Sequence, residues 1–301
     1  MRIAITGPTG AIGTALIKEA ISAGHEVIAI VRPGSSRMSN VAVTKGVEII
    51  ECDISDYASL HGKRQCDAFF HLAWMKTFGA ARDDVYSQVD NIRYALNAVD
   101  LAESWGAKAF VGAGSQAEYG HSEVSLNGSV PVDPTSGYGI AKYSAGKLCR
   151  LFCQQKGLRF NWARILSVYG ENDADHTLIM YLIHTLLEGG VPELTKCEQM
   201  WDYIYSKDAA YALLCIGEKG VDGKVYCIGS GECRPLKAYV EDLRDAVDPS
   251  KEVRFGVKPY YPHQAMYLCA DISELTADTG FRPRYGFKKG ISELIGIIRQ
   301  G

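Results

Sequence analysis

The segment "TGPTGAIG", Thr6–Gly13, decides the fold. It follows the apolar run "RIAIT" and precedes "AIGTALIKEAISAG", whose apolar residues recur at helical spacing up to Gly24. Glycines between a strand and a helix allow a tight turn, and the free N–H groups of the helix start attract phosphate. The segment therefore predicts a strand, a turn and a helix that bind the pyrophosphate of a dinucleotide, with a purely structural turn as the alternative.

Strand-like and helical segments alternate along the first half of the chain. The expected strands are 2–6, 25–31, 47–53, 66–74, 107–115 and 158–170, and the expected helices are 11–24, 83–106 and 136–157. This order implies right-handed crossovers between parallel strands. We therefore predict an α/β fold of the Rossmann type, a doubly wound parallel sheet with helices on both faces.

The alternation breaks down after Gly170. Further helices are expected at 177–190, 207–218, 236–246 and 286–299, and further strands at 201–206 and 223–231. We assign residues 1–166 and 201–228 to a dinucleotide-binding domain. Residues 167–200 and 229–301 are assigned to a smaller, C-terminal substrate-binding lobe.

The composition narrows the class of protein. Of the 301 residues, 47% are hydrophobic and 22% charged, and the net charge of −3 favours neither nucleic acid nor an anionic membrane as a partner. No apolar run is long enough to span a bilayer, and the N-terminus lacks the pattern of a signal peptide. The nine cysteines are odd in number and scattered. We therefore expect a cytoplasmic protein with reduced thiols, no disulfide framework and no metal site.

The end of the second expected strand bears on the choice of dinucleotide. An acid about twenty residues after the glycine turn would hold the ribose of NAD. The segment "AIVRPGSSR" instead offers Arg32, Ser36 and Arg37. Because a cation there favours a 2′-phosphate, we expect NADP(H), with NAD(H) as the alternative. Arg32 as a solvated surface charge is the competing interpretation.

Other cofactor contacts are expected at the ends of the third and fourth strands. Asp53 is placed to accept a hydrogen bond from the adenine amino group, to cap the following helical turn, or to do both. Trp74 is placed either to form a wall of the nicotinamide or sugar pocket or to pack in the core. The remaining expected cofactor residues are Gly7, Thr9, Gly10, Ala11, Ile12, Gly13, Ile54, Leu72 and Ala73.

Tyr138 and Lys142 are spaced i and i+4, so they share one helix face. A tyrosine phenol has a reference pKa of about 10 and is a poor acid or base at neutral pH. A nearby ammonium group lowers that pKa and lets the phenol exchange a proton with a carbonyl or alcohol oxygen. Ser115, at the end of the preceding strand, supplies a hydroxyl partner.

Together these motifs resemble the extended short-chain dehydrogenase/reductase family, over nearly the whole chain. The resemblance is carried by Gly7-x-x-Gly10-x-x-Gly13, Asp53-x-x-Asp56, "HLAW", Asn91, Ser115 and Tyr138-x-x-x-Lys142, and by "WDYIYSKDAA" and "GKVYCIGSGECRPL". It implies that Ser115 orients the substrate carbonyl, Tyr138 is the acid/base and Lys142 lowers its pKa. It also implies that Asn91 supports a proton-relay water and that hydride passes between a nicotinamide and the substrate.

Departures within the motifs favour one reaction of this family. Dehydratases of the family carry an Asp-Glu pair after the catalytic hydroxyl residue, whereas this chain has Gln116 and Ala117. A cysteine of the 3,5-epimerase/reductase branch is also replaced by Ala117. The phrases "GSQAEYG", "WARILSVYG" and "EQMWDYIY" resemble bacterial reductases of nucleotide-diphosphate 4-keto-6-deoxyhexoses, which use NADPH. The alternatives are an NAD-dependent 4-epimerase, a non-catalytic NADP-binding regulator, and a reductase of small aldehydes or phenolic ketones.

The resemblance also suggests where substrate and partner would bind. Ser167 and Trp201 stand where the family often has Asn and Arg close to the sugar nucleotide. Glu118 is expected to be a surface or local hydrogen-bonding residue, and His71 to serve packing. A homodimer is expected through the helices 83–105 and 137–155. The candidate substrate residues are Trp74, Gln116, Tyr119, Ser167, Tyr169, His176 and Trp201.

Overall fold

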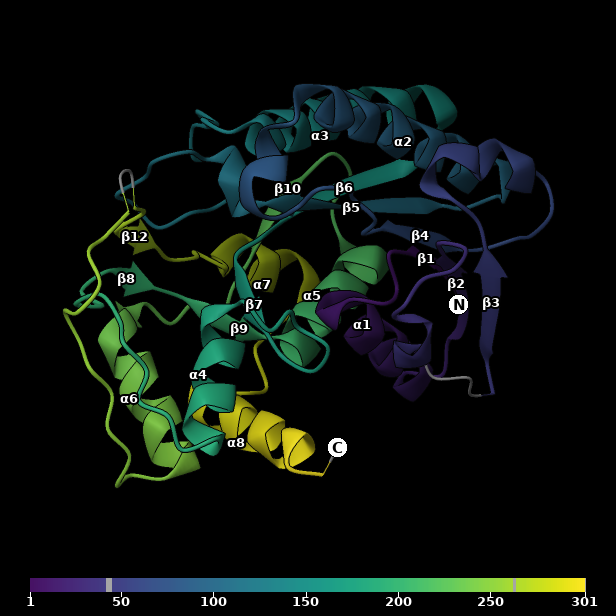
Figure 1. Cartoon of the computed structure of the whole chain (residues 1–301). Coiled ribbons are helices and arrows are strands. Elements are labelled where there is room, and N and C mark those ends of the chain that lie inside the picture. The colour runs from purple at the N-terminus through teal and green to yellow at the C-terminus, as the bar shows by residue number, and fades with distance from the viewer. Residues whose placement is uncertain (42–44, 262–263, 301) are drawn as a thin grey trace.

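A seven-stranded parallel sheet forms the centre of the molecule (Figure 1). The computed structural model describes residues 1–41, 45–261 and 264–300. The strand order is β10-β6-β5-β4-β1-β2-β3. From β1 the chain adds β2 and β3 toward one edge of the sheet and then β4, β5, β6 and β10 toward the other, so the order of strands reverses between β1 and β4. Ligands of such sheets bind at this reversal, beyond the carboxyl ends of the strands. The strands are β1 (Arg2–Thr6), β2 (Glu26–Val31), β3 (Val47–Glu51), β4 (Ala68–His71), β5 (Ala109–Ser115), β6 (Arg159–Ile165) and β10 (Val225–Ile228).

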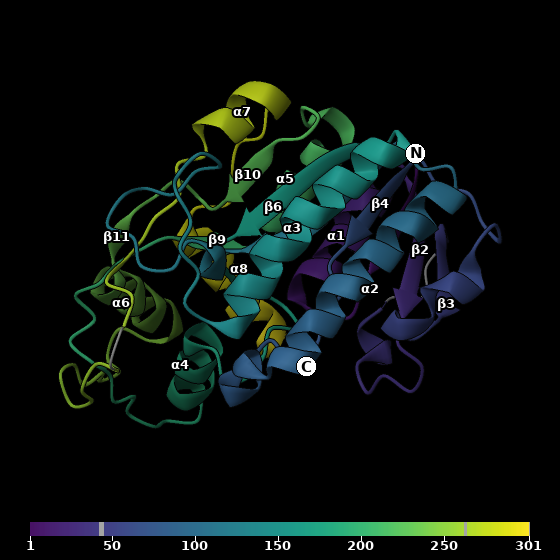
Figure 2. The ribbon, with the colours of Figure 1, turned by 90° about the horizontal axis from the view of Figure 1, so that it is seen from above.

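Helices cover both faces of this sheet (Figure 2). Strand β1 shows why, because Ile3 and Ile5 belong to the core formed with α1 and α5, whereas Ala4 belongs to the core formed with α2 and α3. The predicted doubly wound α/β fold is therefore confirmed. None of the helices in the described residues has the length and apolar character needed to cross a membrane. The helices are α1 (Ala11–Ser22), α5 (Ser206–Lys219), α2 (Val85–Ser104) and α3 (Gly137–Lys156).

Local sequence fixes both ends of α3, the helix that carries Tyr138. At its start the side chain of Ser136 accepts a hydrogen bond from the backbone N–H of Gly139 at 3.1 Å, which is a typical N-cap. At its end Gly157 has a φ of 70°, in the left-handed region that glycine adopts without strain. This start places Tyr138 in the first turn, at the carboxyl edge of the sheet.

The C-terminal lobe lies beside the sheet and has a core of its own (Figure 1). Its core is formed by α4, α6 and α8 together with residues of two small sheets. One sheet has the order β11-β8-β12, and the other pairs β7 with β9. The elements are β7 (Ser167–Tyr169), α4 (Leu178–Leu187), β8 (Met200–Trp201), β9 (Tyr203–Tyr205), β11 (Arg234–Pro235), α6 (Leu236–Val247), β12 (Tyr267–Leu268), α7 (Ser273–Thr279) and α8 (Phe287–Ile298).

Two expectations about this region need correction. The single strand expected over 158–170 is divided at Leu166, because β6 pairs in the main sheet and β7 pairs with β9. The segment 201–228 returns to the main sheet through α5 and β10, but Trp201 pairs with Arg234 and Leu268 in the sheet of the lobe. The helix α7 was not expected. The domain boundaries away from Trp201 stay a prediction.

The cysteines also differ from expectation at one place. Cys233 and Cys269 form a disulfide, whereas we expected every thiol to be reduced. Cys233 directly precedes β11 and Cys269 directly follows β12, and both strands pair with β8, so the small sheet brings the two residues together. The other seven cysteines are free and buried. A spacing of 36 residues gave no signal for this pair.

Candidate active site

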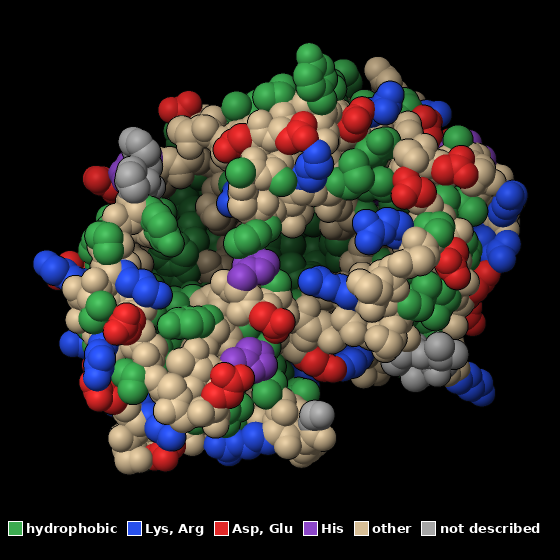
Figure 3. Space-filling model, viewed as in Figure 1, with side chains coloured by type: hydrophobic (Ala, Val, Ile, Leu, Met, Phe, Trp, Pro, Cys, Tyr) green, Lys and Arg blue, Asp and Glu red, His purple; other side chains and the backbone are tan. Residues whose placement is uncertain are grey.

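Two adjoining cavities open at the carboxyl ends of the central strands. Figure 3 shows the molecule hollowed on this face, with hydrophobic side chains gathered in the hollow. The first cavity, of about 410 Å³, extends over the ends of β2 and β3, and the second, of about 360 Å³, extends over β5 and the start of α3. Gly7 and Trp74 line both cavities, so the two form one cleft with two halves.

The glycine turn between β1 and α1 fits a bound pyrophosphate. Gly7 has a φ of 69°, and a Cβ there would lie 2.8 Å from the backbone nitrogen of Ala73. A Cβ at Gly13 would lie 2.4 Å from the carbonyl oxygen of Gly7. Gly10 faces open space, caps α1 without a side chain, and is followed by no acid in the first turn. The free N–H groups of the helix start are therefore open to an anion.

The structure brings most of the expected cofactor residues to the two cavities. Asp53 differs, since it is not among the lining residues and its carboxylate accepts hydrogen bonds from the N–H and hydroxyl of Ser55. These bonds lower the pKa of Asp53 and confirm the capping role, while a contact with adenine stays a prediction. The first cavity is lined by Gly7, Thr9, Arg32, Ser36, Arg37, Ile54, Ala73 and Trp74, and the second by Gly7, Gly10, Ala11, Ile12, Gly13, Leu72, Trp74, Tyr138 and Lys142.

Arg32 and Arg37 give the first cavity a positive end. Both guanidinium groups are free of ion pairs within the part of the chain that the structure describes. Ser35 and Ser36 add hydroxyl groups beside them. An unpaired guanidinium with neighbouring hydroxyls is the arrangement that recognises phosphate.

Ser115, Tyr138 and Lys142 meet in the second cavity. Burial raises the pKa of Tyr138, and a hydrogen bond to the Ser115 hydroxyl and the charge of Arg82 oppose that rise. The Arg82 guanidinium lies 4.6 Å from the centre of the Tyr138 ring, a contact that the sequence did not suggest. The Ser115 hydroxyl is therefore the neighbouring group that most strongly opposes the effect of burial on the pKa of the phenol.

Lys142 is held differently from what we expected. Its ammonium group donates to the carbonyl oxygen of Ala113 at 2.6 Å and lies 3.8 Å from the centre of the Trp74 ring. Burial lowers the pKa of Lys142 to about 7, against the opposing charge of Glu118. The expected effect of Lys142 on the pKa of Tyr138 is thus replaced here by Ser115 and Arg82.

The Asn91 side chain contacts the backbone of Met75. Its Oδ1 accepts from the N–H of Met75 at 2.9 Å, and its Nδ2 donates to the carbonyl oxygen of Met75 at 3.0 Å. The oxygen and the nitrogen of the buried Asn91 amide therefore both bond to the backbone of Met75, the residue directly after Trp74. Asn91 fixes the path of the chain beneath the cleft, and the support of a relay water that the resemblance implied stays a prediction.

Trp74 separates the two halves of the cleft. Its indole N–H donates to Oε1 of Gln88 at 3.0 Å, which fixes the ring plane. The ring meets that of Tyr138 edge to face, with 6.2 Å between centroids. Both interpretations of Trp74 therefore hold, because the ring lines both cavities and also packs against the core beneath α2 and α3.

Two of the expected substrate residues are buried away from the cleft. Tyr119 is 1% exposed and donates its hydroxyl to the carbonyl oxygen of Asn127. Tyr169 is 1% exposed and donates to the carbonyl oxygen of Phe287 inside the lobe. Tyr169 packs among aromatic rings, whereas Tyr119 packs among aliphatic side chains and under the Arg164 guanidinium. Neither lines the cleft, and their contact with a substrate stays a prediction.

The other expected substrate residues lie near the cleft but do not line it. Trp201 donates its indole N–H to the Ser167 hydroxyl at 2.9 Å, so the two departures from the family pattern contact each other. Gln116 is partly exposed beside Ser115. The His176 ring packs at a tilt against the Phe78 ring, with 3.6 Å between ring centroids. Their contact with a substrate stays a prediction.

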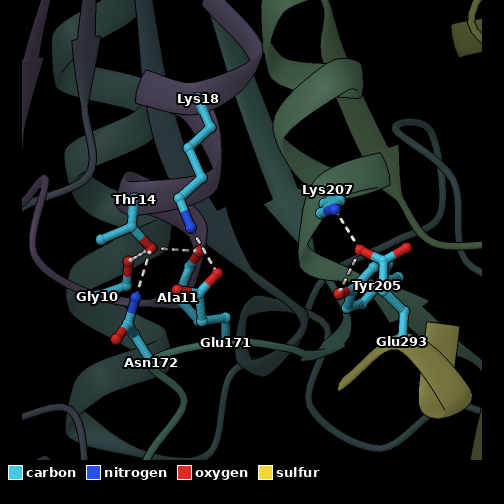
Figure 4. Close-up of polar contacts among 9 residues, drawn as sticks. All are labelled: Gly10, Ala11, Thr14, Lys18, Glu171, Asn172, Tyr205, Lys207 and Glu293. Atoms are coloured by element: carbon cyan, nitrogen blue, oxygen red, sulfur yellow. Dashed lines mark hydrogen bonds and ion pairs between the residues drawn. The ribbon is translucent and has the colours of Figure 1, made fainter. Parts of the chain in front are cut away.

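Residues of the loop after β7 complete the cleft. Asp173 lines the second cavity, a role that the sequence did not suggest. This loop is tied to α1, since Asn172 donates to the Thr14 hydroxyl at 3.3 Å and Glu171 pairs with Lys18 (Figure 4). A second tie, between Lys207 and Glu293, joins α5 to α8 in the same view. The described residues contain no cluster of three or more His, Cys, Asp or Glu side chains that could hold a metal.

Comparisons with known proteins agree with this architecture. Residues 3–229 match the family described as "NAD dependent epimerase/dehydratase family". The dTDP-6-deoxy-L-talose 4-dehydrogenase (NAD(+)) of Aggregatibacter actinomycetemcomitans is 26% identical, covering 88% of this chain and 98% of the relative. The CDP-abequose synthase of Salmonella typhimurium is 25% identical and covers 97% of each chain. The solved UDP-N-acetylglucosamine 4-epimerase of Methanobrevibacter ruminantium M1 superposes with a TM-score of 0.89 at 24% identity, covering 100% of this chain and 99% of the other.

His71 lies below the cleft as a neutral imidazole. It is buried, its Nδ1 lies 2.9 Å from the Thr6 hydroxyl, and its Nε2 has no hydrogen-bond partner among the described residues. Burial and the nearby charge of Lys142 lower the pKa of His71 to about 3. Since the unfolded chain protonates this histidine at a pKa of about 6.5, the folded state loses stability as the pH falls below 6.5.

We expect this loss to reach about 2 kcal/mol between pH 7.5 and pH 5. The His71→Asn variant keeps a polar side chain at this position but has no proton to gain, so its unfolding free energy should fall less over the same range. Urea unfolding of both proteins at a series of pH values measures the difference. Equal pH dependence in the two proteins would show that another group is responsible.

Proposed function

This chain belongs to the NAD-dependent epimerase/dehydratase family, and we propose that it reduces the C4 keto group of a nucleotide-diphosphate 4-keto-6-deoxyhexose with NADPH. Two observations together carry this choice. Ser115, Tyr138 and Lys142 line one cavity, and no acidic residue directly follows Ser115 in the sequence. A keto group needs a hydride and a proton to become an alcohol. Removal of water from a sugar needs further acid and base groups.

The side chains of the second cavity fit the proton half of this reduction. The Ser115 hydroxyl donates a hydrogen bond to the ketone oxygen, and the Tyr138 hydroxyl transfers its proton to that oxygen as the alcohol forms. The high pKa of Tyr138 keeps the phenol protonated at neutral pH, as an acid requires. The glycine turn would hold a nicotinamide dinucleotide, which would supply the hydride.

The absence of elimination groups separates this proposal from the dehydratases. Gln116 and Ala117 follow Ser115 and carry no charge. The next acid, Glu118, points away from the cleft and is occupied by buried hydrogen bonds and an ion pair. A dehydratase removes a proton from carbon and expels water, and no side chain beside Ser115 serves these two steps.

The names of two relatives support the substrate class. One relative is named for oxidoreduction at position 4 of a dTDP-linked 6-deoxysugar, and the other for synthesis of CDP-abequose. The first name also contains NAD(+), whereas Arg32 and Arg37 at the positive end of the first cavity favour a 2′-phosphate. We therefore propose NADP(H) as the preferred cofactor and NAD(H) as the alternative.

A panel of nucleotide-linked ketosugars tests the reaction. Purified protein is mixed with NADPH or NADH and with CDP-, dTDP-, UDP- or GDP-linked 4-keto-6-deoxyhexoses, and nicotinamide absorbance is followed. Oxidation with one nucleotide class would support the reductase and identify its substrate. Inversion of a 4-hydroxyl sugar without net oxidation would identify a 4-epimerase instead. Cofactor binding without either reaction would favour a regulator.

The Tyr138→Phe variant removes the acid oxygen and leaves the ring in place. We expect its turnover to fall by about a hundredfold or more, while its affinity for NADPH stays close to that of the unchanged protein. Tyr143→Phe, on the same helix but outside the cleft, is the matched control and should keep full turnover. Equal turnover in Tyr138→Phe and the unchanged protein would refute the role of Tyr138.

The Arg32→Asp variant tests the cofactor without any sugar substrate. Because it replaces a cation beside the 2′-phosphate by an anion, we expect NADPH affinity to fall about tenfold or more relative to NADH affinity. Nicotinamide fluorescence titrations measure both dissociation constants. Arg282→Asp makes the same charge change at an exposed position outside both cavities and should leave the ratio unchanged. An unchanged ratio in Arg32→Asp would remove Arg32 from the cofactor site.

We also propose a homodimer formed by α2 and α3, which lie side by side (Figure 2). In light scattering we expect a dimer for the unchanged chain and a monomer for Leu151→Glu, because a buried charge opposes an apolar interface. Val221→Glu, outside both helices, should stay dimeric. A monomeric unchanged chain would contradict the proposal. The dimer proposal is supported by exposed apolar side chains on these two helices: Val85, Tyr86, Val89, Ile140, Leu148 and Leu151.

A further inference from the structure

Glu118 is a fully buried carboxylate directly behind the catalytic strand end. Its exposure is 0%, and it lines a separate cavity of about 280 Å³ rather than the cleft. Oε1 accepts hydrogen bonds from the backbone N–H of Ser115 at 2.8 Å and from the indole of Trp162 at 2.9 Å. Oε2 accepts from Nε of Arg164 at 2.8 Å. Three donors therefore fix both oxygens of one acid that does not contact the cleft.

Glycines make the space that this acid needs. A Cβ at Gly114 would lie 2.5 Å from Oε1 of Glu118 and 2.4 Å from the indole nitrogen of Trp162. A Cβ at Gly112 would lie 2.2 Å from Cζ3 of the Trp162 ring. The acid and the indole therefore pack directly on the backbone of β5. Because large side chains and backbone meet so closely, the position of Glu118 is tightly defined.

Glu118 and Lys142 hold the same stretch of backbone. The Lys142 ammonium donates to the carbonyl oxygen of Ala113, and Glu118 accepts from the N–H of Ser115, with Gly114 between the two. An anion and a cation are thus fixed two residues apart on one strand end. Lys142 is itself 3% exposed, so water stabilises its charge poorly.

We propose that Glu118 is a positioning residue for the active site: it fixes the backbone that carries Ser115 and is the buried counter-charge that keeps Lys142 protonated. The catalytic consequence rests on the proposed reductase function, whereas the charge on Lys142 does not. Arg164 neutralises Glu118 in part, since the two side chains are 5% and 1% exposed and form an ion pair. The remaining field of the carboxylate acts on Lys142.

The other groups around Lys142 do not replace this acid. His71, on β4, is neutral because its pKa is lowered to about 3. Cys149 lies about two turns after Lys142 on α3, and its thiol is uncharged because burial raises its pKa well above the usual value. Tyr138 and Trp74 contribute aromatic faces, and Tyr138 is protonated. Asp173 lines the same cavity as Lys142, but Glu118 is the carboxylate whose charge supports the lysine against burial.

The titration of Lys142 tests this proposal directly. Protein labelled with ¹³C at the lysine Cε atoms is titrated by NMR, and the Lys142 signal is identified by its loss in Lys142→Met. We expect a midpoint near pH 7 in the unchanged protein and a midpoint about one pH unit lower in Glu118→Gln. Trp162→Phe removes one hydrogen bond but no charge and is the matched control, with an unshifted midpoint.

The same shift is expected in catalysis. Loss of the carboxylate lowers the pKa of Lys142 and also that of Tyr138, which the charge of Glu118 raises. Since reduction needs a protonated phenol, the alkaline limb of the pH–rate profile should move to lower pH in Glu118→Gln. Should the chain lack reductase activity, this arm fails while the NMR titration still decides the charge on Lys142.

Three results would overturn the proposal. An unshifted Lys142 midpoint in folded Glu118→Gln would remove the counter-charge. An equal shift in Trp162→Phe would assign the effect to packing. A midpoint of about 5 to 6 in the unchanged protein, as for buried lysines without a counter-charge, would show that Glu118 does not keep Lys142 protonated. This result does not depend on the folding of any variant.

Discussion

The cleft depends on one close approach between two stretches of backbone. The turn after β1 lies against the chain after β4, and neither Gly7 nor Gly13 has room for a side chain. The contact is reinforced by Thr6, whose hydroxyl accepts from the N–H of Ala73 and meets His71. It places the free N–H groups of α1 at the point where the strand order reverses. Both halves of the cleft are built outward from this contact, and they share Gly7 and Trp74.

The main sheet could be predicted because a local sequence pattern indicates each of its strands. Most of its strands are short, largely apolar segments that alternate with helical segments, and parallel pairing follows from the alternation. The lobe was harder, because its strands have two or three residues and pair with partners far along the chain. Trp201 pairs with Leu268, and the disulfide between Cys233 and Cys269 depends on that same pairing. Such contacts leave no local pattern in the sequence.

The candidate site divides in the same way. Residues that belong to a motif, such as Ser115, Tyr138 and Arg32, lie in the cleft as predicted. Contacts that depend on packing could not be predicted: Tyr169 lies in an aromatic core, Tyr119 lies among aliphatic side chains, and the Asn91 amide bonds to the backbone of Met75. Arg82 and Glu118 lie in short 3-10 helices and Asp173 lies in the loop after β7, where a charged residue is ordinarily solvated. Their importance follows from what surrounds them in space.

The ties between α1 and the loop after β7 have a consequence for how this loop responds to dissolved salt. Lys18 and Glu171 are 48% and 34% exposed, and exposed ion pairs contribute at most about 1 kcal/mol. The loop that carries Asp173 is thus attached to α1 by one ion pair that dissolved salt screens and by one neutral hydrogen bond, from Asn172 to Thr14. Dissolved salt therefore weakens this attachment in part, while the buried packing beneath the cleft does not depend on ionic strength.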